Sequence, residues 1–247
     1  MNFNTFTLVF LFICFIWSGF TRTGFGFGAN ALMLPFALLV VPDPLIIIPV
    51  VAAQAILFCG FEATRNFLRI DWKTIGWIVT ITAIPIALGI YGLINLPEEI
   101  LTLAVYFVTT GYALKYIFDW QVSKHNKIID FLALIFGGYI TGFSLSGGPL
   151  IVAVALKRIP PALFRNSMLA FWTLIGSTKL ITLALAGVNL QSKLFLFTLP
   201  AVIIGHLIGL YFHGRILQSK KFYQFLGIML LVISTLGITK ILLGFLI

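Results

Sequence analysis

Glycines, hydroxyl side chains and an amide side chain gather at two breaks in otherwise apolar sequence, near residues 24–30 and 142–149. The first amides of a helix are unpaired and carry a partial positive charge. Glycine lets the backbone approach a ligand closely, and nearby hydroxyls supply further donors. These residue types predict an anion site at each break. The candidate binding residues are Gly26, Gly28 and Asn30 at the first break, and Ser144, Ser146, Gly147 and Gly148 at the second. Close helix packing through small residues is the alternative use of these glycines.

Four further polar side chains fall within or beside apolar segments, and each is a candidate for contact with a solute. Lys179 lies inside the 163–187 segment, where a charge is costly and usually functional, unless it extends to the interface. Arg22 precedes the first break and is either a membrane anchor or a site residue. Gln54 lies in mid-segment and could donate to an oxyanion or form a hydrogen bond between helices. His206, also in mid-segment, could relay a proton or donate to the solute, with a packing role as the alternative.

The acidic side chains all fall at or near segment ends. They are Asp43, Glu62, Asp71, Glu98, Glu99, Asp119 and Asp130. A chain of buried carboxylates for protons is therefore not expected, and a cation pathway lacks its usual ligands. An anionic solute fits this distribution better.

Enzyme chemistry finds no support in the sequence. Three dispersed histidines and two cysteines within apolar runs, Cys14 and Cys59, form neither a nucleophile–base pair nor a metal cluster. The Gly-Phe-Gly-Phe-Gly stretch lacks the strand and the Lys-Ser/Thr of a nucleotide-binding loop. We predict a protein that is not an enzyme and has no cofactor, no catalytic residues and no metal site.

The elements that must position these residues are membrane helices. Of 247 residues, 60% are hydrophobic and 9% are charged, against about 25% charged in soluble domains. Most apolar segments have the length of about 17–25 residues that crosses a bilayer. The expected segments are 4–21, 29–41, 45–63, 73–94, 100–118, 128–143, 149–156, 163–187, 193–213 and 222–246.

The predicted fold class is an all-α polytopic membrane protein with about eight to ten hydrophobic helical segments. Segment 4–21 has no basic start and no cleavage site, so we expect a retained helix and not a signal peptide. Segment 149–156 is too short to span and should be half of a broken or re-entrant helix. The 4–41 hairpin either spans fully or is re-entrant.

Lysine and arginine predict the orientation. Four connections carry three basic residues each: Arg65, Arg69 and Lys73; Lys115, Lys124 and Lys127; Lys157, Arg158 and Arg165; Arg215, Lys220 and Lys221. The 95–99 turn carries none. The positive-inside rule places the basic connections in the cytoplasm and the acidic turn outside. Because the net charge of +9 is spread over these connections, nucleic-acid binding is not expected.

An internal repeat appears when the chain is displaced by 118 residues. Gly24-Phe25 then falls on Gly142-Phe143, and Pro42 falls on Pro160. We predict a first repeat over 1–122 and a second over 123–247, each with a Gly-rich broken or re-entrant hairpin. The basic residues place the corresponding connections 62–73 and 188–192 on opposite sides, so the repeats should be inverted, as in many transporters.

These two glycine motifs, together with Pro35, Pro42 and Pro149, resemble the paired repeats of the TauE/SafE family over nearly the whole chain. The resemblance implies a permease of a prokaryotic cytoplasmic (inner) membrane that exports sulfite or handles sulfonates. In the first repeat, Ala29-Asn30 replaces further glycines of the family pattern.

The combined prediction is a secondary transporter of a small sulfur-containing anion, with the two breaks facing each other and the repeats alternating access. An anion channel of the same fold and a non-transporting scaffold subunit are the alternatives. The expected partners are the solute and the lipid bilayer, and a homo-oligomer is left open.

Overall fold

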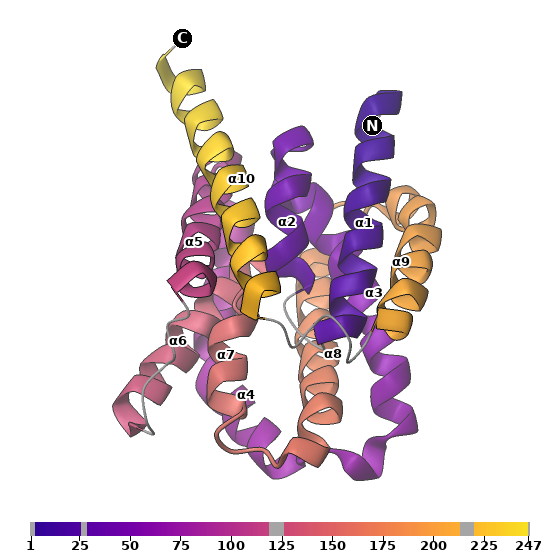
Figure 1. The fold of residues 1–247 in the computed structure, drawn as a ribbon, viewed down its shortest axis with the longest axis vertical. Helices are drawn as coiled ribbons and strands as arrows, with labels where there is room; N and C mark the ends of the chain where they lie inside the picture. The colour runs from indigo at the N-terminus through magenta and orange to yellow at the C-terminus, as the bar shows by residue number, and fades with distance from the viewer. Residues whose placement is uncertain (1–2, 26–28, 119–125, 213–219, 247) are drawn as a thin grey trace. The chain divides into compact units, whose positions relative to one another are not determined.

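The computed structural model describes residues 3–25, 29–118, 126–212 and 220–246. Within these ranges every regular element is helical (Figure 1). The elements are α1 Thr5–Phe25, α2 Ala29–Val40, α3 Pro44–Arg65, the short 3-10 helix η1 Phe67–Arg69, α4 Trp72–Asn95, α5 Glu98–Phe118, α6 Lys127–Ser144, α7 Gly148–Ala155, α8 Pro161–Leu185, α9 Ser192–Phe212 and α10 Lys220–Leu246. Each expected apolar segment corresponds to one of these α-helices.

Eight of the described helices are long and apolar enough to cross a membrane. The exceptions are α2, with 12 residues, and α7, with 8 residues. Large apolar side chains lie exposed on the long helices, among them Ile84, Tyr91 and Leu185. In lipid such side chains meet acyl chains in place of water. The chain is a multi-pass, all-helical membrane protein, and this fold class is confirmed.

Local sequence explains where several helices begin. The side chains of Asp43 and Asn126 accept hydrogen bonds from the amides of Leu45 and Ile128, which caps the starts of α3 and α6. Asp71 similarly accepts from the Thr74 amide at the start of α4. These caps satisfy donors that the helix itself leaves unpaired.

The helices divide into two compact units. The first unit comprises Met1–Ile47, Leu96–Gln121 and Leu196–Ile247, and the second comprises Ile48–Asn95 and Val122–Phe195. Unit 1 therefore contains α1, α2, α5, α10 and most of α9, whereas unit 2 contains α4, α6, α7, α8 and most of α3. Each unit combines helices from both predicted repeats, whose boundaries stay a prediction.

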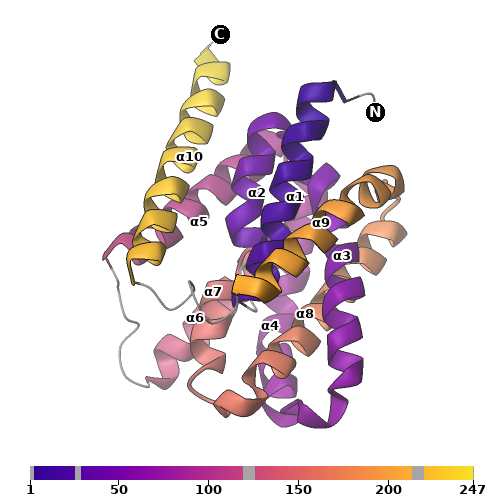
Figure 2. The same cartoon turned by 45° about the vertical axis from the view of Figure 1, so that its right-hand side comes forward.

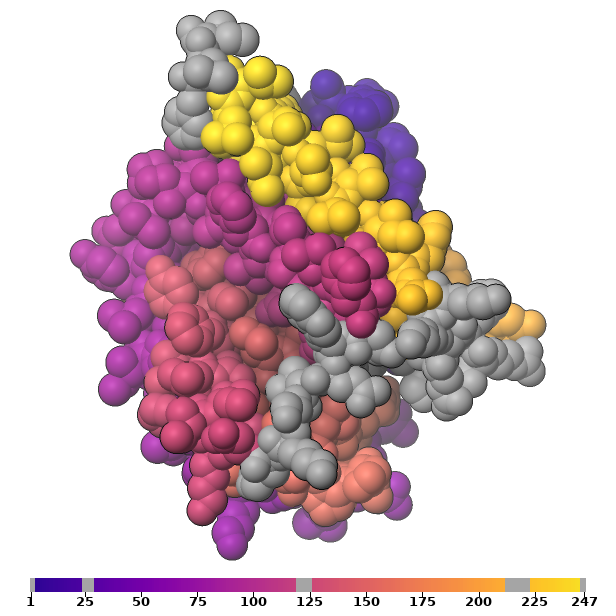
Figure 3. Space-filling model, turned by 60° about the vertical axis from the view of Figure 1, so that its left-hand side comes forward, coloured from indigo at the N-terminus to yellow at the C-terminus, as the bar shows by residue number. Residues whose placement is uncertain are grey.

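In unit 1, glycines and small hydroxyl residues allow helices to pack closely. A methyl group at Gly205 of α9 would overlap the Ile16 carbonyl of α1, and one at Gly237 of α10 would overlap the Tyr106 ring of α5. The hydroxyl of Thr110 in α5 donates to Ser234 Oγ in α10 at 3.0 Å. Figure 3 shows yellow α10 lying against magenta α5.

Glycines also allow the helices of unit 2 to pack closely. Gly89 of α4 faces Gly142 of α6 so closely that a methyl group on either would overlap the backbone of the other helix. Gly176 of α8 packs against the Ala52 carbonyl of α3. Short α7 runs beside α6 (Figure 2). This close packing holds the α6–α7 break, and therefore the second candidate site, within the interior of unit 2.

Candidate functional site

The second break lies between α6, which ends at Ser144, and α7, which begins at Gly148. Leu145 ends α6 in the left-handed conformation, with φ of 58°, which costs about 1–2 kcal/mol for a residue other than glycine. Pro149 occupies the first turn of α7, where its missing N–H costs nothing. The chain therefore stops and restarts a helix within three residues, all of them buried.

The serine hydroxyls of this break bond to the break itself. Ser144 Oγ donates to the Ile140 carbonyl at 2.8 Å and accepts from the Ser146 amide at 3.3 Å. Ser146 Oγ donates to the Ser144 carbonyl at 3.3 Å. Both side chains are buried. These bonds hold the shape of the break, and a solute would have to compete with them.

Gly147 has a role in close helix packing, which is the alternative use of the glycines named above. A methyl group there would overlap the Gly137 carbonyl and the Thr141 hydroxyl of α6. The absence of a side chain therefore brings the start of α7 directly onto the last turns of α6. This closeness places the amides at the start of α7 beside the polar groups of Thr141.

Lys179 of α8 reaches the same break. Its side chain is fully buried, and Nζ donates to the Thr141 carbonyl at 2.9 Å. That carbonyl also accepts from the Leu145 amide at 3.0 Å and belongs to the last turn of α6, where the helix dipole favours a cation. Among the described residues, no carboxylate forms an ion pair with Lys179. The lysine lies inside unit 2, and none of its surface is exposed.

Thr141 is a member of this group that the sequence reasoning missed. Its side chain is fully buried, and its hydroxyl has no hydrogen-bond partner among the described residues. A signal was available, because the 118-residue displacement places Thr23 on Thr141, directly before the matched Gly-Phe pairs. The structure thus brings Ser144, Ser146, Gly147, Gly148 and Lys179 together around Thr141. Gln54 is fully buried in α3 of the same unit.

The first break belongs to unit 1, and Gly26 and Gly28 lie outside the described residues. On its two sides, Arg22 is buried in the last turn of α1, and Asn30 stands in the first turn of α2. A hydrogen bond of 2.6 Å joins Thr23 Oγ of α1 to His206 Nδ1 of α9. His206 therefore joins α9 to α1. Its partner Thr23 is the residue that the 118-residue displacement places on Thr141.

No group of three histidine, cysteine, aspartate or glutamate side chains within the described ranges is arranged to hold a metal ion. Cys14 and Cys59 are both buried. The second break is therefore built from one cation, hydroxyls and backbone amides. Such groups neutralise and donate hydrogen bonds to an anion.

A family model described as sulfite exporter TauE/SafE matches residues 11–236. The chain belongs to the TauE/SafE family. The match covers both breaks and all eight spanning helices in whole or in part, and it confirms the resemblance carried by the glycine motifs. TauE/SafE proteins are membrane transporters, which agrees with the multi-pass fold. Comparison with curated proteins and with solved structures finds no match, so the roles of individual residues rest on the geometry.

Proposed function

We propose that this TauE/SafE protein is a secondary transporter that exports a small sulfur-containing anion, sulfite or an organosulfonate, across a prokaryotic cytoplasmic membrane. The observation that carries the proposal is the fully buried Lys179, whose ammonium group donates to a neutral carbonyl at the α6–α7 break. The family supplies the sulfur chemistry, and the site supplies the preference for an anion.

Burial of an ammonium group raises the free energy of the folded protein unless another group compensates its charge. Insertion scales assign a lysine in mid-membrane a cost of about 2.5–3.5 kcal/mol. One carbonyl satisfies a single donor of the three on Nζ, and it carries no full charge. An anion beside Nζ would supply the missing charge. The cost of Lys179 is therefore recovered when the solute binds.

The neighbouring groups suit an oxyanion. The Thr141 hydroxyl can donate one hydrogen bond, and the amides at the start of α7 add the positive end of a helix dipole. The three oxygens of a sulfite or sulfonate group can then accept from three kinds of donor, which are the ammonium group, the hydroxyl and the backbone amides. An ammonium ion or a metal cation would meet the same charge as its own and be rejected.

The order of helices supports alternating access between two repeats. The second-half helices α7, α8 and α9 begin at Gly148, Pro161 and Ser192, and their predicted counterparts α2, α3 and α4 begin at Ala29, Pro44 and Trp72. Each pair fits the 118-residue displacement to within about two residues. Corresponding pairs also pack alike, since α1 meets α9 and α6 meets α4 through glycines. Movement of one repeat against the other would expose the site to each side in turn.

Orientation follows from the connections. We propose that the basic connections, including the stretch from Arg65 at the end of α3 to Arg69 in η1, face the cytoplasm and that the turn at Leu96 faces outward. In this orientation an exported anion enters from the side where the positive connections concentrate it.

The experiment is uptake into proteoliposomes containing the purified protein, with sulfite, sulfate, thiosulfate, sulfonates, carboxylates and chloride compared at equal concentration. We expect saturable flux of sulfite or a sulfonate that is accelerated by the same anion on the opposite side. Non-saturating flux at channel rates would contradict the carrier mechanism. Equal flux of carboxylates or chloride would contradict the substrate class, and absence of flux for every anion would contradict transport.

A further inference from the structure

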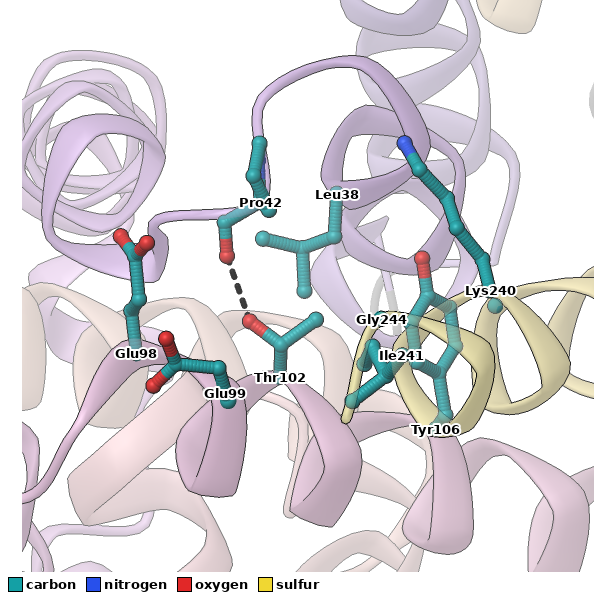
Figure 4. A pocket seen from close by; sticks show the side chains of 10 residues that line it. Leu38, Pro42, Glu98, Glu99, Thr102, Tyr106, Lys240, Ile241 and Gly244 are labelled. Atoms are coloured by element: carbon teal, nitrogen blue, oxygen red, sulfur yellow. Dashed lines mark hydrogen bonds between the residues drawn. The ribbon is translucent and has the colours of Figure 1, made fainter. Parts of the chain in front are cut away.

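A pocket of about 370 Å³ is lined by residues of unit 1, whereas the proposed transport site is built from residues of unit 2. It is enclosed by the end of α2, the first turns of α5 and the last turns of α10 (Figure 4). The residues that matter to its chemistry are Leu38, Glu98, Glu99, Thr102, Lys240 and Ile241. Its volume falls within the range of about 300–1,000 Å³ that small-molecule sites occupy.

Opposite charges line the two sides of this pocket. Glu98 and Glu99 form the first turn of α5, where the helix dipole favours carboxylates. Neither forms an ion pair with a basic side chain among the described residues. Lys240 of α10 lies on the other side and donates to the Leu39 carbonyl at 2.9 Å. A ligand with separated positive and negative groups would match both sides.

The remaining lining offers little further polarity. Thr102 donates to the Pro42 carbonyl, and the Tyr106 hydroxyl donates to the Pro35 carbonyl at 3.3 Å. Both hydroxyls are therefore engaged with the backbone. Leu38 and Ile241 form an apolar wall. The two charged sides must therefore recognise the ligand, and any apolar chain of that ligand would lie along α10.

The limits of the spanning segments indicate that the pocket lies at the level of the lipid headgroups. The spanning segment of α5 begins at Glu98, and that of α10 ends at Gly244. The ends of spanning segments mark the polar boundary of the bilayer. A ligand in this pocket would have its polar part at the boundary and any acyl chains toward the hydrocarbon.

We propose that this pocket binds the headgroup of a phospholipid with a free ammonium group, of the phosphatidylethanolamine type. The ammonium group would contact Glu98 and Glu99, and the phosphate would face Lys240. An –NH₃⁺ group donates three hydrogen bonds, which a trimethylated ammonium cannot do. The pocket should therefore prefer phosphatidylethanolamine to phosphatidylcholine. It should also reject phosphatidylglycerol, which brings no cation to the carboxylates.

The test is native mass spectrometry of the purified full chain with the three phospholipids supplied at equal concentration. We expect phosphatidylethanolamine to be retained about tenfold more than the other two, the difference that one charge-assisted hydrogen bond produces. Glu98→Gln combined with Glu99→Gln should abolish the preference, and Lys240→Met should weaken retention. Glu62→Gln is the matched control, because it also removes a carboxylate but lies 3.7 Å from Arg165 in unit 2.

Equal retention of the three lipids, or a preference that survives the double variant, would overturn the proposal. Soluble phosphoethanolamine is a second arm, and its binding at the concentration of the lipid would show a soluble zwitterion as the occupant instead. Thermal unfolding in lipid-free detergent checks that each variant is folded. If the double variant is unstable, Glu98→Gln and Lys240→Met, both at exposed side chains, provide the same comparison singly.

Discussion

Thr141 has a buried hydroxyl without a hydrogen-bond partner among the described residues, and its carbonyl holds Lys179. A buried hydroxyl of this kind costs about 1–3 kcal/mol in protein mutational data. A buried polar group without a partner calls for an explanation, and contact with the transported anion is the one that we propose. The isosteric change to valine separates the two roles, because it removes the hydroxyl and keeps the shape and the carbonyl.

Thr141→Val should therefore raise stability and weaken substrate binding together. We expect the free energy of unfolding to rise by about 1 kcal/mol and the KM for uptake to rise about fivefold to tenfold. Thermal unfolding in detergent and uptake kinetics in proteoliposomes give the two values. An unchanged KM would show that the hydroxyl does not touch the solute.

For Asp130 we predict a contribution to the stability of the α6–α7 hairpin. Its carboxylate is buried at the start of α6 and lies 2.7 Å from Lys157 Nζ, which follows α7. The ion pair joins the two ends of the α6–α7 hairpin. Asp130→Asn should lower the free energy of unfolding by about 1–3 kcal/mol. If Lys157→Met costs the same with and without Asp130→Asn, the two side chains are not coupled.

The sequence predicts the environment of some single residues and not of others. Lys179 was predictable because a charge within an apolar segment is rare. Its partner was not, because the Thr141 carbonyl already accepts from the nearby Leu145 amide, and only the fold brings Lys179 Nζ to it as a second donor. Asp130 was correctly placed near a segment end, but its burial depends on Lys157, which lies 27 residues away. Gly26 and Gly28 lie outside the described residues and stay a prediction.

At the scale of elements, glycine contacts set how closely the helices pack. Gly89→Ala or Gly142→Ala would place a methyl group on the backbone of the partner helix, and overpacking of this kind costs about 1–3 kcal/mol. Thermal unfolding should show the loss. Gly76→Ala and Gly111→Ala are matched controls in α4 and α5, because nothing lies within 4 Å of the added methyl group. These controls should be neutral or stabilising, and an equal loss in them would refute the packing explanation.

Helix bounds were the most predictable feature of the elements. Apolar length alone predicts each long helix to within a few residues, since every backbone group in lipid must be paired within a helix. The short α7 was predictable from Pro149 and from the proline at residue 160. The partners of the helices were not, because the pairing of α4 with α6 depends on Gly89, which no local pattern distinguishes from the exposed Gly76.

The whole molecule carries the prediction of orientation. Leu96→Cys, in the turn that we propose faces outward, should react with a membrane-impermeant thiol reagent added outside intact cells. Leu68→Cys in η1, whose side chain is 95% exposed, should react only after the membrane is opened. Native Cys14 and Cys59 are buried and should give little background. Reaction of Leu68→Cys from outside would reverse the proposed orientation.

At this largest scale, composition predicts the membrane and the glycine motifs predict the TauE/SafE family. The division into units was not predictable, because each unit combines helices far apart in the chain. The proposed substrate class depends on family membership together with a few buried groups. The central physical claim of the proposed function is that Lys179 binds the transported anion.

The concentration dependence of sulfite or sulfonate uptake by Lys179→Met tests that claim most directly, with Lys193→Met as the control. Lys193 is an exposed lysine at the start of α9. We predict that Lys179→Met raises KM at least about tenfold, or abolishes uptake, while its unfolding temperature stays equal or rises because a buried charge is removed. Lys193→Met should retain the wild-type KM. A folded Lys179→Met protein that transports with the wild-type KM would contradict the account.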